Sequence, residues 1–146
     1  MKEPVFKKED NVTICEVTDD LGRVFRGEAR CHPDDKDFES PITGGVIAEM
    51  RARIEVARTY RNDLRVKLAA LNQLLYSMNK SSHFSKDSYE AKMLYRQIKL
   101  IKDDLEIAKH QLAVLKVDLF EYINEKERVH KYLRKHSEDK DRSKMN

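Results

Sequence analysis

The chain has 146 residues, of which 38% are charged and 40% hydrophobic, with 4 Gly, 3 Pro and no Trp. Its mean hydropathy of −0.75 is low for a compact globule but typical of long amphipathic helices, so a deep-cored enzyme is not expected. No apolar run approaches the ~18 residues of a membrane span, and the charged residues 1–10 lack the apolar stretch of a signal peptide. We therefore expect a cytoplasmic protein.

The net charge of +3 is unevenly distributed along the chain. Residues 1–42 hold 7 Lys and Arg against 11 Asp and Glu, and residues 43–146 hold 22 against 15. The basic second part suits an anionic partner, although helix-rich segments also carry Lys for solubility.

The N-terminal segment has the pattern of a small antiparallel sheet. Residues 12–18 and 23–31 alternate in polarity, and the turn residues 19–22 between them predict a β-hairpin, with Val5 and Phe6 in a third strand. Because so short a sheet is marginal alone, a helix or a second subunit must cover it.

The connector at residues 32–42 is acidic, but its spacing fits no EF-hand loop, and a solvated loop is favoured over a metal site. The two cysteines, Cys15 and Cys31, are expected to be reduced. No metal-binding, nucleophile or phosphate-loop motif is present, so we predict no metal, no cofactor, no catalytic residue and a protein that binds rather than catalyses.

Two helices follow, each with an apolar seam spaced alternately by three and four residues. The first seam comprises Ile47, Met50, Ile54, Ala57, Arg61, Leu64, Leu68, Leu71, Leu75 and Met78. The second comprises Leu94, Ile98, Ile101, Leu105, Ala108, Leu112, Leu115, Leu119, Tyr122, Lys126, Val129 and Leu133.

Helices over 45–78 and 88–137 would be about 50 and 75 Å long. If an antiparallel turn joins them, the first helix covers the second only as far as about residue 122. Residues 87–90 form a capping-box pattern at the start of the second helix. The fold class expected is α+β, with a β-hairpin module and connector at 1–42, a helical hairpin at 43–137 and a disordered tail at 138–146.

A further apolar stripe on the second helix predicts a partner subunit, because a helix with two apolar faces has more than one neighbour. The stripe repeats every seven residues, at Met93, Leu100, Ile107 and Val114.

Two places could bind an anionic ligand. Arg61 interrupts the first apolar seam and is expected to lie near Ala57 and Ala108. Its guanidinium either pairs with a ligand anion, snorkels to solvent, or pairs with Asp104 or Asp118. The turn between the helices gathers aromatic rings and cations suited to a purine nucleotide, or to a merely packed loop. These residues are His83, Phe84, Lys86, Tyr89, Lys92, Tyr95, Arg96 and Lys99.

The stretch Gly27-Glu28-Ala29-Arg30-Cys31-His32-Pro33-Asp34-Asp35, with a hairpin before it and two long helices after it, resembles the Thoeris anti-defence protein 1 family. The resemblance, over roughly residues 10–135, implies a phage protein in the host bacterial cytoplasm. Members bind and sequester glycocyclic ADP-ribose, the signal made by the TIR-domain enzyme of the Thoeris system, without cleaving it. Some also hold cyclic oligonucleotides at a separate site, as hexamers assembled from dimers.

Carried onto this chain, the resemblance implies a homodimer or hexamer that binds a cyclic nucleotide. The expected ligand residues are Arg61, Asn79, Phe84, Tyr89, Arg96 and Lys99, and those of a second nucleotide site are Arg23 and Arg26. The alternative is a structural coiled-coil protein that docks on a phage or host protein. Nucleic-acid binding is disfavoured, since no recognition element accompanies the basic helices.

Overall fold

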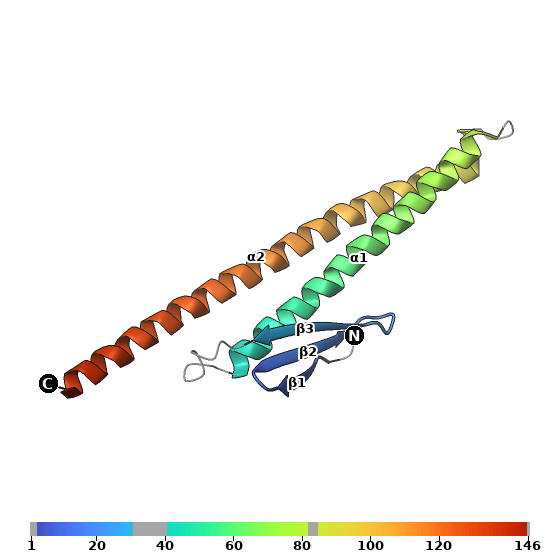
Figure 1. The fold of residues 1–146 in the computed structure, drawn as a ribbon. Coiled ribbons are helices and arrows are strands. Elements are labelled where there is room, and N and C mark those ends of the chain that lie inside the picture. Colours follow the sequence, from blue (N-terminus) through green and yellow to red (C-terminus); the bar gives the residue numbers. More distant parts are fainter. Residues whose placement is uncertain (1–2, 31–40, 82–84, 146) are drawn as a thin grey trace. The chain divides into compact units, whose positions relative to one another are not determined.

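The computed structural model describes residues 3–30, 41–81 and 85–145, with the side chains of Pro41 and of residues 137–145 left aside. An N-terminal antiparallel sheet in the order β1-β2-β3 is followed by two long helices (Figure 1), which confirms the expected α+β class. The elements are β1 (Val5–Glu9), β2 (Val12–Thr18), β3 (Val24–Arg30), α1 (Pro41–Asn79) and α2 (Tyr89–Met145).

The predicted hairpin is formed by β2 and β3, and β1 adds the third strand on the other side of β2. Cys15 at the centre of β2 lies opposite Gly27 of β3 and Phe6 of β1. As the alternation predicts, Gly27 and Ala29 are buried, whereas Val24, Arg26 and Arg30 on the other face of β3 are exposed. Gly22 has a φ of 80°, the left-handed conformation that the turn requires.

The chain packs as two compact units. The first, called here the sheet unit, comprises Met1–Val56 and Val114–Asn146, and the second, the hairpin unit, comprises Ala57–Ala113. These limits differ from the expected boundary between residues 42 and 43, because the first turns of α1 pack on the sheet. Each helix contributes to both units.

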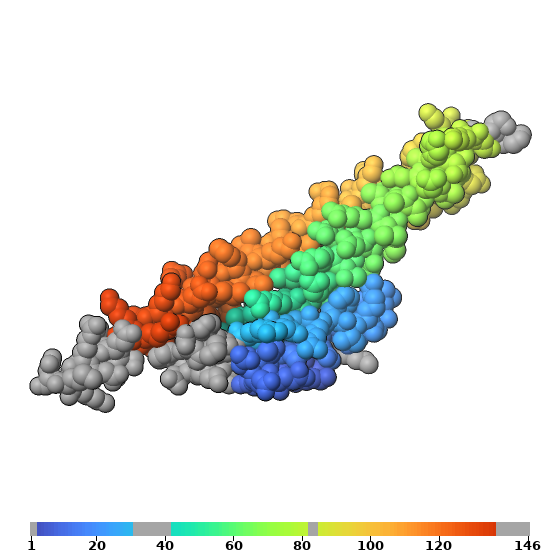
Figure 2. Space-filling model, in the orientation of Figure 1, coloured from blue at the N-terminus to red at the C-terminus, as the bar shows by residue number. Residues whose placement is uncertain are grey.

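In the sheet unit, α1 covers one face of the sheet through small residues. Ala48 and Ala52 are fully buried against Cys15, Val17 and Ala29. A Cβ atom at Gly27 would lie within 3.0 Å of the backbone of both Ala48 and Ala52, so only glycine permits this approach. Figure 2 shows the sheet residues in blue lying directly against the start of α1.

Arg51 of α1 adds a polar contact to this packing. Its Nη1 donates a hydrogen bond to the carbonyl oxygen of Glu28 at 2.6 Å. Because both β1 and β3 are edge strands of the sheet, this bond satisfies a carbonyl of one edge.

The hairpin unit is an antiparallel helix pair whose covered faces are the two predicted seams. Leu64 of α1 packs with Leu105 and Ala108 of α2, and Leu68 and Ile101 pack against this cluster. Further buried side chains on the α2 seam within this unit are Leu94, Ile98 and Leu112. The periodicity therefore identified the buried faces correctly.

The C-terminal part of α2, within the sheet unit, is only partly covered. Seam residues Leu115, Leu119, Tyr122 and Lys126 are half-buried, whereas Val129 and Leu133 further along are exposed. No helix in the described ranges has the length and apolar character needed to cross a membrane.

The helix ends agree with the capping chemistry. Pro41 begins α1, a position where its missing N–H costs nothing. Ser88 caps α2, with its Oγ accepting a hydrogen bond of 3.2 Å from the amide of Ala91. α2 continues to Met145, beyond the helix end expected at residue 137 and into the segment expected to be a tail. This segment holds no Gly or Pro, and its Glu, Lys and Arg residues are good helix formers, so nothing interrupts propagation.

Candidate functional site

Arg61 is placed on the covered face of α1 in the hairpin unit. It precedes Leu64 by one turn, and Leu64 packs with Leu105 and Ala108 of the antiparallel α2. One turn back along α1 corresponds to one turn forward along α2, so Arg61 faces the segment between Ala108 and Leu112. Both of those residues are only 2% exposed, and Arg61 itself is half-buried.

The guanidinium of Arg61 is incompletely paired. Its Nε is buried and has no hydrogen-bond partner, while Nη2 donates to Oδ1 of the neighbouring Asn62 at 3.5 Å, the limit of a hydrogen bond. A buried donor without an acceptor costs about 1–3 kcal/mol, and more where the group is charged. An unsatisfied group of this kind is therefore a candidate for contact with a ligand or partner.

The structural interpretations of Arg61 are that it snorkels or that it forms an ion pair with Asp104 or Asp118 across the two helices. Among the described residues, neither Asp104 nor Asp118 forms a hydrogen bond or ion pair with Arg61. Asp104 and Asp118 are both exposed. Two explanations of Arg61 are left, partial snorkelling and pairing with a ligand anion, and its buried Nε favours pairing with a ligand anion.

The other expected ligand residues lie toward the opposite end of the hairpin unit. Asn79 is the last residue of α1 and Tyr89 the first of α2, with Tyr89 73% exposed. Arg96 and Lys99 are exposed on α2. Phe84 and His83 lie outside the described residues.

The two groups of expected residues do not meet in one chain. Asn79 lies about 27 Å along α1 from Arg61, and Arg96 lies about 18 Å along α2 from Ala108, at the helical rise of 1.5 Å per residue. A small cyclic nucleotide bound at Arg61 therefore cannot contact Asn79 of the same chain. The predicted residues are compatible with one ligand only if two copies contribute to its site.

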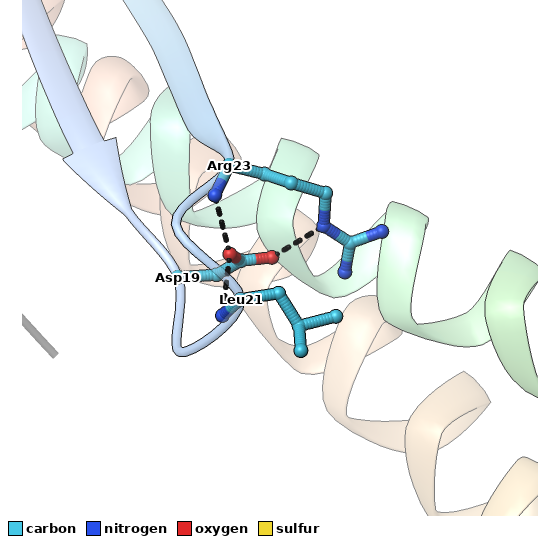
Figure 3. Close-up of polar contacts among 3 residues, drawn as sticks. All are labelled: Asp19, Leu21 and Arg23. Atoms are coloured by element: carbon cyan, nitrogen blue, oxygen red, sulfur yellow. Dashed lines mark hydrogen bonds and ion pairs between the residues drawn. The ribbon is translucent and has the colours of Figure 1, made fainter.

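Arg23 and Arg26, the residues expected for a second nucleotide site, are paired with carboxylates. Nε of Arg23 donates to Oδ2 of Asp19 at 2.7 Å, and Oδ1 of Asp19 accepts from the amides of Leu21 and Arg23 at 3.0 and 2.8 Å (Figure 3). Arg26 forms an ion pair with Glu28 at 3.1 Å. The Arg26–Glu28 pair is exposed and therefore weak, whereas the Arg23–Asp19 pair is partly buried, so both arginines are partly neutralised.

These contacts shift the protonation of Asp19. Desolvation alone would raise the pKa of its carboxyl group, but the hydrogen bonds from Arg23 and Leu21 and the positive charge of Arg23 outweigh it. The pKa of Asp19 therefore lies below its ordinary value of 3.8. The sequence predicted a turn here but not the Asp19–Arg23 pair. Aspartate side chains in turns accept hydrogen bonds from the backbone amide two residues further on, so the position of Asp19 at the start of the turn was the available signal.

Neither an activated cysteine nor a metal centre is found in the described parts of the chain. Burial of Cys15, together with the negative charge of Glu49, raises the pKa of its thiol, which therefore stays protonated and weakly nucleophilic. Within residues 3–30, 42–81 and 85–136, whose side chains the structure describes, no three His, Cys, Asp or Glu side chains gather as metal ligands would. The acidic residues of the connector lie outside these ranges.

Comparison with protein-family models, curated protein sequences and solved structures finds no significant match to the chain.

Proposed function

We propose that this protein is a phage-encoded anti-defence protein of the host bacterial cytoplasm that binds and sequesters a cyclic ADP-ribose isomer. The ligand is glycocyclic ADP-ribose, made by the TIR-domain protein of the Thoeris immune system, and it is held without being degraded. The identity of the ligand rests on the resemblance of residues 27–35 and of the element order to the family. Cyclic oligonucleotides are a second ligand class under the same proposal, at Arg23 and Arg26.

The observation that carries a binding role is the buried, unpartnered Nε of Arg61. A guanidinium offers two parallel donors that match the oxygens of a phosphate, and such charge-assisted bonds are about twice as strong as neutral ones. The diphosphate of a cyclic ADP-ribose would supply the acceptor that Nε lacks. Sequestration needs affinity and abundance rather than turnover, which suits a site built around one cation in an apolar layer.

A second copy of the chain is part of the proposal. The separation of Arg61 from Asn79 requires two copies if both contact one ligand. In the hairpin unit, α2 also carries Met93, Leu100 and Ile107 at seven-residue intervals, with exposed fractions of 36%, 54% and 56%. An apolar stripe of this period is suited to pack against another helix.

Calorimetry tests the proposal with the purified protein and both glycocyclic ADP-ribose isomers, with 1′′–2′ and 1′′–3′ linkages. Saturable binding is expected, and heat denaturation should release the ligand with unchanged mass. Absence of binding to either isomer, or recovery of a hydrolysed product, would refute sequestration.

The role of Arg61 is tested by Arg61→Met, with Arg65→Met as the matched control. Arg65 is exposed one turn further along α1 and should tolerate the change. Arg61→Met should weaken binding by at least about 30-fold, equivalent to 2 kcal/mol, because it removes a buried charge pair, whereas Arg65→Met should leave binding unchanged. Unfolding stability should be maintained or raised, because an unsatisfied buried donor is removed. Equal effects of the two variants would contradict this role.

The alternative function is a coiled-coil protein that docks on a phage or host protein, and the exposed stripe of α2 is the observation in its favour. Under this alternative Arg61→Ala and Phe84→Ala retain anti-defence activity, while Leu100→Asp abolishes it without changing nucleotide affinity. Small-angle scattering separates the two further, since a monomeric protein would lack the intersubunit site that sequestration requires.

A further inference from the structure

The sheet unit contains a pocket of about 520 Å³ between the edge strand and the first turns of α1. This volume is within the ~300–1,000 Å³ range of small-molecule sites. The lining residues are Phe6, Lys7, Lys8, Thr13, Ile42, Gly45, Val46 and Glu49. Arg61 is not among them, and it belongs to the hairpin unit.

Strand register explains which residues point toward the pocket. Phe6 pairs with Cys15 and Lys8 pairs with Thr13, and Cys15 is buried against α1. Alternation along β1 therefore places Phe6 and Lys8 on the same helix-facing side of the sheet.

The apolar part of the pocket is open to solvent. Phe6 is 50% exposed and Ile42 is 76% exposed, although both are large hydrophobic residues. Gly45 keeps the space beside the Phe6 ring open. A Cβ atom at residue 45 would lie 3.7 Å from Cε1 of Phe6, which is ordinary contact distance, and would occupy part of that space. A planar ring could stack on Phe6 here.

The charge of the pocket favours an anion. Glu49 is neutralised by Arg53, whose Nη2 and Nε lie 2.8 and 3.2 Å from its Oε1, and Lys7 is paired with Glu16 at 3.3 Å. Within the described ranges the exposed side chain of Lys8 has neither an ion pair nor a hydrogen bond, and the first turn of α1 carries no acidic residue. The uncompensated charge at the pocket is therefore the Lys8 ammonium.

We propose that this pocket binds a small organic anion that carries a planar aromatic ring. The ring stacks on Phe6 against Ile42 and Val46, and the anionic group, a phosphate or a carboxylate, pairs with Lys8. The site is independent of the proposed nucleotide site at Arg61.

The experiment is titration of the ¹⁵N-labelled full chain with phenyl phosphate, followed through the amide resonances of Thr13 and Gly45. Inorganic phosphate supplies the anion without the ring, and phenol supplies the ring without the anion. Saturable shifts are expected with phenyl phosphate and not with either fragment at the same concentration. Benzoate then distinguishes a carboxylate from a phosphate preference. No shift with phenyl phosphate or benzoate, or equal shifts with inorganic phosphate or phenol, would overturn the ligand class.

Two variants locate the binding without disturbing the fold. Lys8→Glu should weaken binding by about tenfold or more, because attraction becomes repulsion. Ile42→Glu should weaken it more than the matched neutral change Ile42→Gln, and an acidic residue in the first turn of α1 favours the helix. Binding unchanged by Lys8→Glu and equal in the two Ile42 variants would place the ligand elsewhere and overturn the proposal. Arg61→Met leaves these shifts intact, which separates this site from the proposed sequestration site.

Discussion

The contact between Gly27 and α1 predicts that a single methyl group will separate the sheet from its helix. In Gly27→Ala, the new Cβ would lie within 3.0 Å of the carbonyl oxygen of Ala48 and the amide nitrogen of Ala52. Both atoms belong to the helix backbone and cannot turn aside as the end of a flexible side chain can. The helix must therefore move away from the sheet as a body.

The displacement affects the layer formed by Cys15, Val17, Ala29, Ala48 and Ala52. Overpacking in a close-packed layer costs about 1–3 kcal/mol, and backbone atoms on one side put this variant at the upper end. Gly27 is also in an extended strand, so the new side chain brings no conformational benefit large enough to compensate.

Urea unfolding followed by circular dichroism measures this effect at a fixed protein concentration. Gly45→Ala is the matched control, because its Cβ would meet the Phe6 ring at 3.7 Å and alanine favours the helix by about 0.5–1 kcal/mol. The same substitution should thus destabilise at residue 27 and be neutral or stabilising at residue 45. Gly27→Ala unfolding at the same urea concentration as Gly45→Ala would refute the close approach.

Three other outcomes follow from the structure. The folded pKa of Asp19 is lowered, so its turn contacts stabilise the fold above pH 3.8 and are lost as the pH falls through the folded pKa; Asp19→Asn should lower the melting temperature at pH 7, and this difference should shrink as the pH falls below 3.8. In a Cys31→Ser background, the Cys15 thiol should react with Ellman's reagent only as the chain unfolds, and rapid reaction of the native protein would contradict its burial. Leu105→Ala, at a position 7% exposed, should cost about 2–5 kcal/mol in urea unfolding. Leu74→Ala, at a position 50% exposed, should cost under about 0.5 kcal/mol, and similar costs would argue against the hairpin core.

The local elements of this protein were predictable from its sequence. Alternation in residues 12–18 and 23–31 identified the β2–β3 hairpin and the buried side of β3, and the pattern of residues 87–90 marked the start of α2. Seams spaced by three and four residues identified the faces that carry Leu64 and Leu105. These features depend on neighbours within a few residues, so short-range pattern is sufficient to predict them.

The tertiary structure decided which surfaces meet. A periodic pattern shows that a face is covered but not what covers it, so the fit of Ala48 and Ala52 onto Gly27, and the division of α1 between two units, did not follow from the sequence. The same limit applies to Arg61. Its place on an apolar seam is a property of the sequence, but its buried Nε depends on how closely α2 approaches, because the length and flexibility of an arginine side chain allow it to reach either solvent or the interior.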